Sequence, residues 1–434
     1  MNLKEFKQVK SKGGDKKIMK TKIKQEKGIT LIALVVTIVV LLILAGVSIN
    51  ALFGDMGIIQ KAQDAQNKMD QAAQNDLDAV NSLNEWLESK TNGSTGEDDN
   101  LSTMPKISTL VGTVVEKNTK AEDAYGNKIT IPKGFKVLAH GTEAGSATYT
   151  YSGDNIPAVQ DGIVIENGED KNQFVWVPVG TIKNRDNTTN TITLGRYEFD
   201  SSTGALKSNT PVQVASVENC TQEVTINTYY KELSTSRISS SSSENTTARN
   251  LKEFISTTLA NGGYYIARFE ASKNTTTNKV ESKYNQTALT DITQPDAAKA
   301  AREMYGEVKE NNELVYASDL ANSYAWDTAI IFIQTYGTGA DASSYASKNK
   351  STLHAKTGIN PDKYCNICDM SGNVWEWTTE YSTGHSNSSY HCTYRGGYFE
   401  HSRDGAAGDY TSKRQEGSGN YAQEHSLRLL LYVK

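Results

Sequence analysis

One charge-free apolar segment constrains this chain more than any other feature. Between Gly28 and Gly54 there is no Asp, Glu, Lys or Arg, and residues 29–49 are almost wholly aliphatic. In an α-helix rising about 1.5 Å per residue, these 21 residues span roughly 31 Å, close to the thickness of a bilayer's hydrocarbon core. A secretory signal core is shorter, about 7–15 residues, and precedes a small-residue cleavage site that is missing here. We therefore predict a transmembrane helix.

The charges around this segment predict its orientation. Residues 1–28 carry ten lysines and three acids, a charge of +7, while the whole chain has a net charge of −5, which leaves −12 for the remainder. A lysine-rich flank stays in the cytoplasm, so the C-terminal part is predicted to lie outside the cell. An acidic body also argues against nucleic acid as a partner, because neutralising phosphates requires a basic face.

The junction between leader and apolar segment carries a processing signal. The run KGITLIAL, residues 27–34, resembles the cleavage and methylation motif of type IV prepilins. The resemblance implies a prepilin peptidase that cuts after Gly28, methylation of Ile29, and pilin-like subunits as partners. Ala33 occupies the fifth mature position, where prepilins usually carry a glutamate. The carboxylate of that glutamate normally pairs with the N-terminal amine of a neighbouring subunit. The motif therefore predicts an anchor and leaves open whether the chain joins a fibre.

We predict four regions along the whole chain. After the basic leader 1–28, a pilin-like transmembrane and stalk helix covers 29–90, because apolar residues continue at three-to-four-residue spacing to Leu87. This stalk packs either on its own globular domain or on sister helices. The acidic, Gly/Ser-containing stretch 91–104 is typical of a linker. The body is 105–434, with a polar low-complexity insertion at about 200–250.

The body combines many short strands with few helices, which favours an α+β domain over a βαβ sheet. The predicted strands are Val111–Val115, Lys128–Ile131, Phe135–Ala139, Ile163–Glu166, Phe174–Val179, Thr191–Phe199 and Gly262–Glu270. The predicted helices are Leu251–Leu259, Pro295–Tyr305 and Tyr324–Tyr336.

Several motifs in the body resemble one known family. They are DMSGNVWEWT at 369–378, RGGYF at 395–399 and SLRL at 426–429, preceded in the same order by FVWVPVG at 174–180 and GGYYIARFEAS at 262–272. This pattern is similar to the formylglycine-generating enzyme, or sulfatase-modifying factor, family over roughly residues 130–434. The resemblance implies an irregular C-type-lectin-like fold. A pilin-like N-terminus joined to this domain is typical of surface proteins of clostridial-type bacteria.

The family's enzymatic chemistry is not expected here. Its enzymes act through two cysteines after the Arg-Gly-Gly turn, where thiolates bind copper and activate oxygen. His401 and Ala406 occupy those positions, and no cysteine follows Cys392. The iron-dependent branch of the fold needs His-x-x-x-His-x-Glu, and none of the six histidines has that spacing. We therefore expect no copper and no catalytic residues.

The four cysteines allow two structural roles. Cys365 and Cys368 form a CxxC, but no thioredoxin-like βαβ unit surrounds it. With Cys392 and either Cys220 or His391, they could supply four zinc ligands. A structural disulfide is the alternative in an exported protein. The family resemblance implies the pair Cys365–Cys392, with Cys220 and Cys368 unassigned.

A metal is also implied by the GNxWEW turn. In the family's enzymes this turn supplies oxygens to a structural Ca²⁺, an ion that prefers hard oxygen ligands. The resemblance therefore implies a calcium site at Asn373, Trp375 and Glu376. In the alternative, Asn373 and Glu376 satisfy backbone groups while Trp375 and Trp377 fill the core.

The stretch between Arg395 and Leu427 is the predicted recognition surface. It is rich in Tyr and Arg, which give large contacts at low entropy cost; the alternative is a solvated loop of mixed charge. In lectin-like folds it faces the ligand, and variable proteins of diversity-generating retroelements use the same region. The predicted ligand-binding residues are Tyr398, Glu400, His401, Arg403, Asp404, Tyr410, Lys413, Arg414, Glu416, Asn420 and Tyr421.

Together these features favour a membrane-anchored surface binding protein, an adhesin or receptor-binding module for an unknown protein or glycan. The alternatives are a structural minor pilin or pseudopilin and, least favoured, a formylglycine-generating-type oxidoreductase.

Overall fold

The computed structural model describes most of the body and little of the N-terminal region. The described residues are 36, 39, 104–139, 157–201, 203–233, 247–337, 355–359, 363–383, 391–399, 411–418 and 424–434. Val36 and Val39 are helical and exposed. The leader, the cleavage site at Gly28 and Ile29, the stalk and most of the linker lie outside the described residues. The chain divides into two compact units, Met1–Asn100 and Leu101–Lys434. In the part that is described, no helix has both the length and the hydropathy to cross a bilayer.

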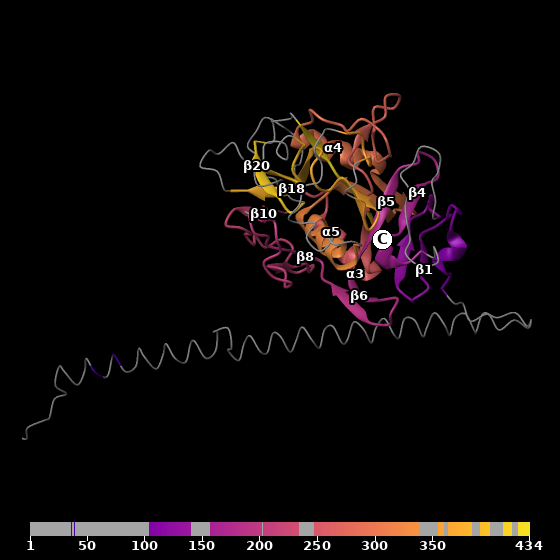
Figure 1. Cartoon of the computed structure of the whole chain (residues 1–434), viewed down its shortest axis with the longest axis horizontal. Helices are drawn as coiled ribbons and strands as arrows, with labels where there is room; N and C mark the ends of the chain where they lie inside the picture. The colour runs from indigo at the N-terminus through magenta and orange to yellow at the C-terminus, as the bar shows by residue number, and fades with distance from the viewer. Residues whose placement is uncertain are drawn as a thin grey trace, which may run out of the picture. The chain divides into compact units, whose positions relative to one another are not determined.

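The second unit is built on a seven-stranded antiparallel sheet in the order β14-β15-β22-β11-β5-β4-β3. The C-terminal strand β22 therefore lies inside the sheet and not at its edge. Two strands of this sheet, β5 and β4, are labelled side by side in Figure 1. The strand bounds are β3 Phe135–Val137, β4 Val164–Asn167, β5 Gln173–Pro178, β11 Gly263–Ala267, β14 Glu307–Glu310, β15 Glu313–Leu320 and β22 Leu429–Val433.

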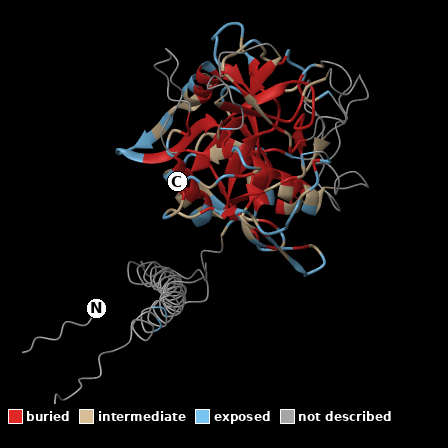
Figure 2. Cartoon of the chain, turned by 90° about the vertical axis from the view of Figure 1, so that its left-hand side faces the viewer, coloured by how far each residue is buried: buried red, intermediate tan, exposed pale blue. Residues whose placement is uncertain are grey.

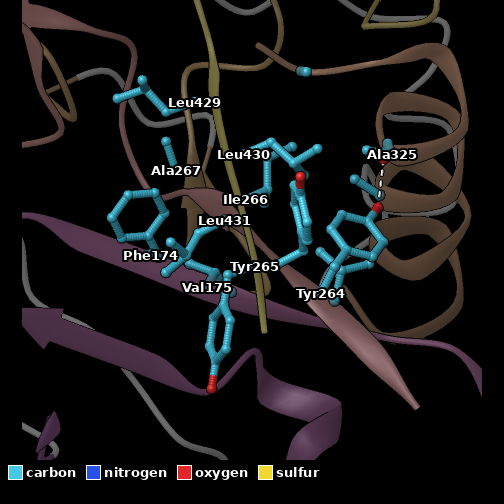
Figure 3. Packing of buried hydrophobic residues seen from close by; sticks show 14 of the residues in the cluster. Phe174, Val175, Tyr264, Tyr265, Ile266, Ala267, Ala325, Leu429, Leu430 and Leu431 are labelled. Atoms are coloured by element: carbon cyan, nitrogen blue, oxygen red, sulfur yellow. Dashed lines mark hydrogen bonds between the residues drawn. The ribbon is translucent and has the colours of Figure 1, made fainter. Parts of the chain in front are cut away.

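The inner strands form the core. Every residue of β5, β11 and β22 is buried, which explains why these strands are largely apolar and do not alternate. Figure 2 shows buried residues throughout the interior of the body. The Trp176 and Tyr265 rings, on paired strands, lie 4.9 Å apart. Gly263 must be a glycine, because a Cβ there would lie 2.4 Å from the Trp176 ring. In the close view, the Tyr264 hydroxyl donates to the Ala325 carbonyl and so joins the sheet to a helix (Figure 3).

Three α-helices pack against these strands: α3 Leu251–Asn261, α4 Gln294–Tyr305 and α5 Ser323–Tyr336. Each begins at a polar cap, as short helices require. The side chains of Asn250, Thr293 and Asn322 accept hydrogen bonds from backbone N–H groups of the first turns. Helix α3 ends at Gly262 in the left-handed conformation (φ 73°).

A smaller sheet carries the WEWT run of the DMSGNVWEWT motif and the strand that leads into RGGYF. It has the order β10-β18-β19-β20, and β21 pairs with β18 in parallel. Its strands are β10 Tyr230–Glu232, β18 Trp375–Ser382, β19 Cys392–Arg395, β20 Arg414–Gly417 and β21 His425–Leu427.

The remaining described elements are short. Two-stranded pairs are formed by β1 Thr119–Glu122 with β2 Lys128–Ile131, β6 Gly180–Lys183 with β7 Thr189–Ile192, β8 Gly195–Arg196 with β9 Gln213–Val214, β12 Ser272–Lys273 with β13 Val280–Glu281, and β16 Lys363–Tyr364 with β17 Ile367–Cys368. The 3₁₀ turns are η1 Ile107–Leu110 and η2 Val159–Asp161.

This mixture of sheets and a few helices agrees with the predicted α+β, C-type-lectin-like class, but two strand predictions were wrong. Val111–Val115 is not a strand: Val111 makes one isolated bridge with Val137, and the Val115 N–H donates to the Phe135 carbonyl. Thr191–Phe199 is divided between β7 and β8, because the chain leaves one hairpin at Ile192 and enters another at Gly195.

Candidate functional site

An open cavity of about 790 Å³ lies beside strand β20. We call it the β20 cavity. Its walls come from three segments far apart in the sequence, residues 198–207, residues 227–230 and residues 412–416, with Tyr394 of β19 also contributing. Hydrogen bonds join the walls. Ser412 Oγ donates to the Gly204 carbonyl at 2.8 Å, Asn227 Nδ2 donates to the Phe199 carbonyl at 3.3 Å, and the Tyr230 hydroxyl donates to Glu416 Oε2 at 2.9 Å.

Beneath the cavity lies a buried network of three arginines and two carboxylates. Glu380 of β18 accepts from Arg196 Nη2 at 2.9 Å and from Arg414 Nε at 3.0 Å, and its Oε2 lies 3.6 Å from Arg395 Nη1. Asp327 of α5 accepts from Arg395 at 2.8 Å and also from Arg414. These side chains are at most 2% exposed. Burial alone would raise the pKa of Glu380, but Arg414, Arg196 and Arg395 hold it below its usual value.

The network fixes both ends of the connection between β19 and β20. Arg395 is the last residue of β19, Arg414 is the first of β20, and the two are directly paired across the strands. The chain turns away after β19 through Gly396 and Gly397, both at positive φ (88° and 86°), where side chains would be strained. The connection between β19 and β20, which is the first part of the predicted recognition segment, therefore starts and ends on the same buried charge network.

The cavity rim includes a strained turn. Asn227 and Thr228 are both in the left-handed region, at φ 47° and 72°. For a β-branched residue such as Thr228 this conformation is a marked outlier. The turn ends at Tyr230, whose hydroxyl donates to Glu416 Oε2 at 2.9 Å, and it leaves Tyr229 42% exposed. Strain of this kind persists where the surrounding structure enforces it, and it is often found at functional sites.

The predicted ligand-binding residues lie in different environments. Lys413 and Glu416 line the β20 cavity. Tyr398 is half-buried and stacks on Trp375, with ring centroids 5.9 Å apart. Arg414 lines the cavity as well, and its guanidinium is at the same time bound to the buried carboxylates of Asp327 and Glu380. The other predicted contacts lie outside the described residues: Glu400, His401, Arg403, Asp404, Tyr410, Asn420 and Tyr421.

One wall of the cavity was missed by the sequence reasoning. Residues 198–201, Lys207 and residues 227–230 flank or fall in the predicted low-complexity insertion, yet they line the cavity beside the small sheet. They add Glu198, Asp200, Lys207 and Tyr229 to the site. The one residue that could have indicated this wall from the sequence is Arg196, an arginine within a predicted strand. Its guanidinium donates to Glu380 and to the carbonyls of Val224 and Tyr230.

The predicted calcium residues belong to a second buried cluster. Arg428 donates to both oxygens of Glu376, at 2.8 Å to Oε2 and 2.6 Å to Oε1. Asn373 Oδ1 accepts from the Ala355 N–H at 2.7 Å, and its Nδ2 donates to Glu270. Because protein donors already bind these oxygens, Asn373 and Glu376 do not fit a calcium site in this arrangement.

The tryptophans of the same motif are core residues. Trp375 is 4% exposed and packs edge-on against Tyr394, with ring centroids 4.8 Å apart. Trp377 is fully buried, and its Nε1 donates to the Ile292 carbonyl. Glu270 and Asp369 complete the cluster, and burial together with neighbouring carboxylates raises the pKa of both, that of Asp369 to about 7.

The cysteines do not form the disulfide that the resemblance implied. All four are free thiols. Cys365 lies in the turn between β16 and β17 beside the Phe332 carbonyl of α5, whereas Cys392 is in β19, between β18 and β20. Burial raises the pKa of both thiols. Within the described ranges, no group of three or more His, Cys, Asp or Glu residues is arranged to hold a metal ion.

Comparison with known proteins gives the family. No curated protein matches the chain. Among solved structures it is similar to Treponema denticola variable protein 1, at 12% identity over 61% of this chain and 97% of that one, with a TM-score of 0.22. The model of the sulfatase-modifying factor enzyme 1-like domain matches residues 163–426, which is more than half of the chain. The five residues of the network beneath the cavity and the DMSGNVWEWT and RGGYF motifs fall within this match, and the chain belongs to the sulfatase-modifying factor enzyme 1-like family.

Proposed function

We propose that this chain is a membrane-anchored binding protein of the cell surface and that the β20 cavity holds its ligand. The cavity itself is the observation that carries the proposal. Its volume of about 790 Å³ lies within the range of ligand sites, about 300–1,000 Å³. A rigid charged platform supports it, and side chains from three segments converge on it.

Binding is favoured over catalysis by the sequence near the cavity. His401 and Ala406 stand where the family's enzymes carry their two cysteines, so this segment has no thiolate to bind copper or exchange with a substrate thiol. The cavity lining offers carboxylates, amides, amines and tyrosines, which are hydrogen-bonding and packing groups.

The charge-free segment between Gly28 and Gly54 and the lysine-rich leader support the anchor. If the prepilin-type motif is used, cells with a prepilin peptidase will yield a mature chain that starts at Ile29, which mass spectrometry of the membrane fraction can detect. External protease should then remove the body from intact cells. A body that stays protected in intact cells would refute the orientation.

The binding function is tested by filling the cavity. The purified full chain in detergent would be applied to arrays of extracellular proteins and glycans, together with Ser201→Trp, which places an indole in the cavity lining. Ser108→Trp makes the same change at an exposed position outside the lining. We expect Ser201→Trp to abolish a signal that Ser108→Trp retains. Signals that are absent, or identical for both variants, would refute the proposed site.

A further inference from the structure

Building on the proposed binding function, we infer that the β20 cavity takes a neutral carbohydrate, with a sugar ring lying on the exposed face of Tyr229. Three features of the lining lead to this ligand class: its charge balance, its exposed aromatic surface and its hydrogen-bonding groups.

The lining has no net charge. It contains three carboxylates, from Glu198, Asp200 and Glu416, and three cations, from Lys207, Lys413 and Arg414. Two of the cations have carboxylate partners: Lys207 Nζ lies 2.8 Å from Glu198, and Arg414 is bound in the buried network. An anionic ligand such as a phosphate or a sialic acid would have to compete with these carboxylates. The balance therefore favours a neutral ligand.

The aromatic surface in the cavity is narrow and placed at one side. Phe199, Tyr230 and Tyr394 are 2%, 6% and 7% exposed, whereas Tyr229 is 42% exposed. The cavity thus offers one accessible ring and no deep apolar hole of the kind that holds the side chains of a bound peptide. The C–H face of a sugar ring carries partial positive charge and packs well on the negative face of an aromatic ring.

The groups around this ring suit hydroxyls. A sugar hydroxyl both donates and accepts, and the lining offers carboxylate acceptors at Asp200 and Glu416 together with the amides of Asn227 and Gln415. The turn that presents Tyr229 is held in a strained conformation at Asn227 and Thr228. The ring is therefore pre-positioned, which lowers the entropy cost of binding.

The test is calorimetric titration of the full chain with four neutral trisaccharides: maltotriose, cellotriose, chitotriose and mannotriose. A polyoxyethylene detergent is used because it carries no sugar, and sialyllactose serves as the charged counterpart. We expect at least one neutral sugar to bind, Tyr229→Ala to weaken that binding about tenfold or more, and Tyr229→Phe, which keeps the ring, to bind nearly as wild type. Asp200→Asn is a second variant that remains informative if Tyr229→Ala does not fold.

The inference is overturned if none of the four sugars binds at millimolar concentration, if sialyllactose binds best, or if Tyr229→Ala binds as tightly as wild type. A protein ligand on the array that is lost in Ser201→Trp, combined with no sugar binding, would refute the carbohydrate and leave the binding function standing. An array without any cavity-dependent signal would refute the binding function itself.

Discussion

Replacing Glu380 by Gln should severely destabilise the body, because Glu380 is the carboxylate shared by three buried arginines. Its oxygens accept from Arg196 and Arg414 at 2.9–3.2 Å and lie 3.6 Å from Arg395. Without this charge, Arg196 loses the carboxylate it is paired with, and Arg395 and Arg414 keep only Asp327. Removing one partner of a buried ion pair costs about 3–5 kcal/mol, since the remaining charges stay desolvated. We expect a loss in this range, at its upper end.

The control is an ion pair of similar length at the surface. Lys106 Nζ lies 2.6 Å from Glu122, but these side chains are 49% and 26% exposed. An exposed pair contributes about 0–1 kcal/mol, so Glu122→Gln should change the free energy of unfolding little. Comparing the two variants separates the effect of burial from that of distance.

The assay is urea unfolding of the full chain, followed by the fluorescence of the tryptophans in the body, which are all buried. Because the pKa of Glu380 is lowered in the folded chain, its contribution is present above the unfolded pKa and is lost as the pH falls through the folded value. The difference between Glu380→Gln and wild type should therefore shrink in acid. A neutral-pH loss no larger than that of Glu122→Gln would refute the network's importance.

Three further outcomes are expected. Burial raises the pKa of Glu232 to about 7, so the protonated carboxyl stabilises the fold below the unfolded pKa, and this stability is lost as the pH rises through about 7. Glu232→Gln should therefore flatten the fall in melting temperature between acid and neutral pH. An unchanged slope would contradict this. Thr228→Asn should stabilise the chain by about 1 kcal/mol in urea unfolding, because Asn tolerates the left-handed conformation; a destabilised variant would argue against strain there. Thiol titration of the unreduced chain in urea should find four free thiols, whereas two would indicate the Cys365–Cys392 disulfide.

The strands that could be predicted are those whose signals are local. Lys128–Ile131 was predicted with its exact ends, because an alternating run is closed by the turn at Pro132 and Gly134. Val111–Val115 has a similar apolar run, but it lies beside β3 with one isolated bridge and does not pair as a strand. The apolar run of Val111–Val115 is no weaker than that of Lys128–Ile131, so the neighbouring segments decide which run becomes a strand.

Only part of the candidate site could be predicted, again because only part of it has a local signal in the sequence. Lys413 and Glu416 were found because they follow a recognisable motif at a short distance. Residues 198–207 and 227–230 are polar and carry no periodic pattern, so composition alone suggested a surface insertion. Their place at the cavity depends on Arg196, which reaches Glu380 across 184 positions of sequence. No local pattern encodes such a contact.

The buried network also explains how residues of the binding surface can change without destabilising the fold. Arg395 and Arg414 hold the two ends of one connection to the same pair of carboxylates, and all of these charges are enclosed. The separation and direction of the two ends are therefore set by buried ion pairs, which all lie beneath the cavity except for the part of Arg414 that lines it. Side chains on the cavity rim, such as Tyr229 and Lys413, can then change without removing a core contact. A charge network of this kind contributes little net stability compared with apolar packing, but it specifies one geometry, which a binding site requires.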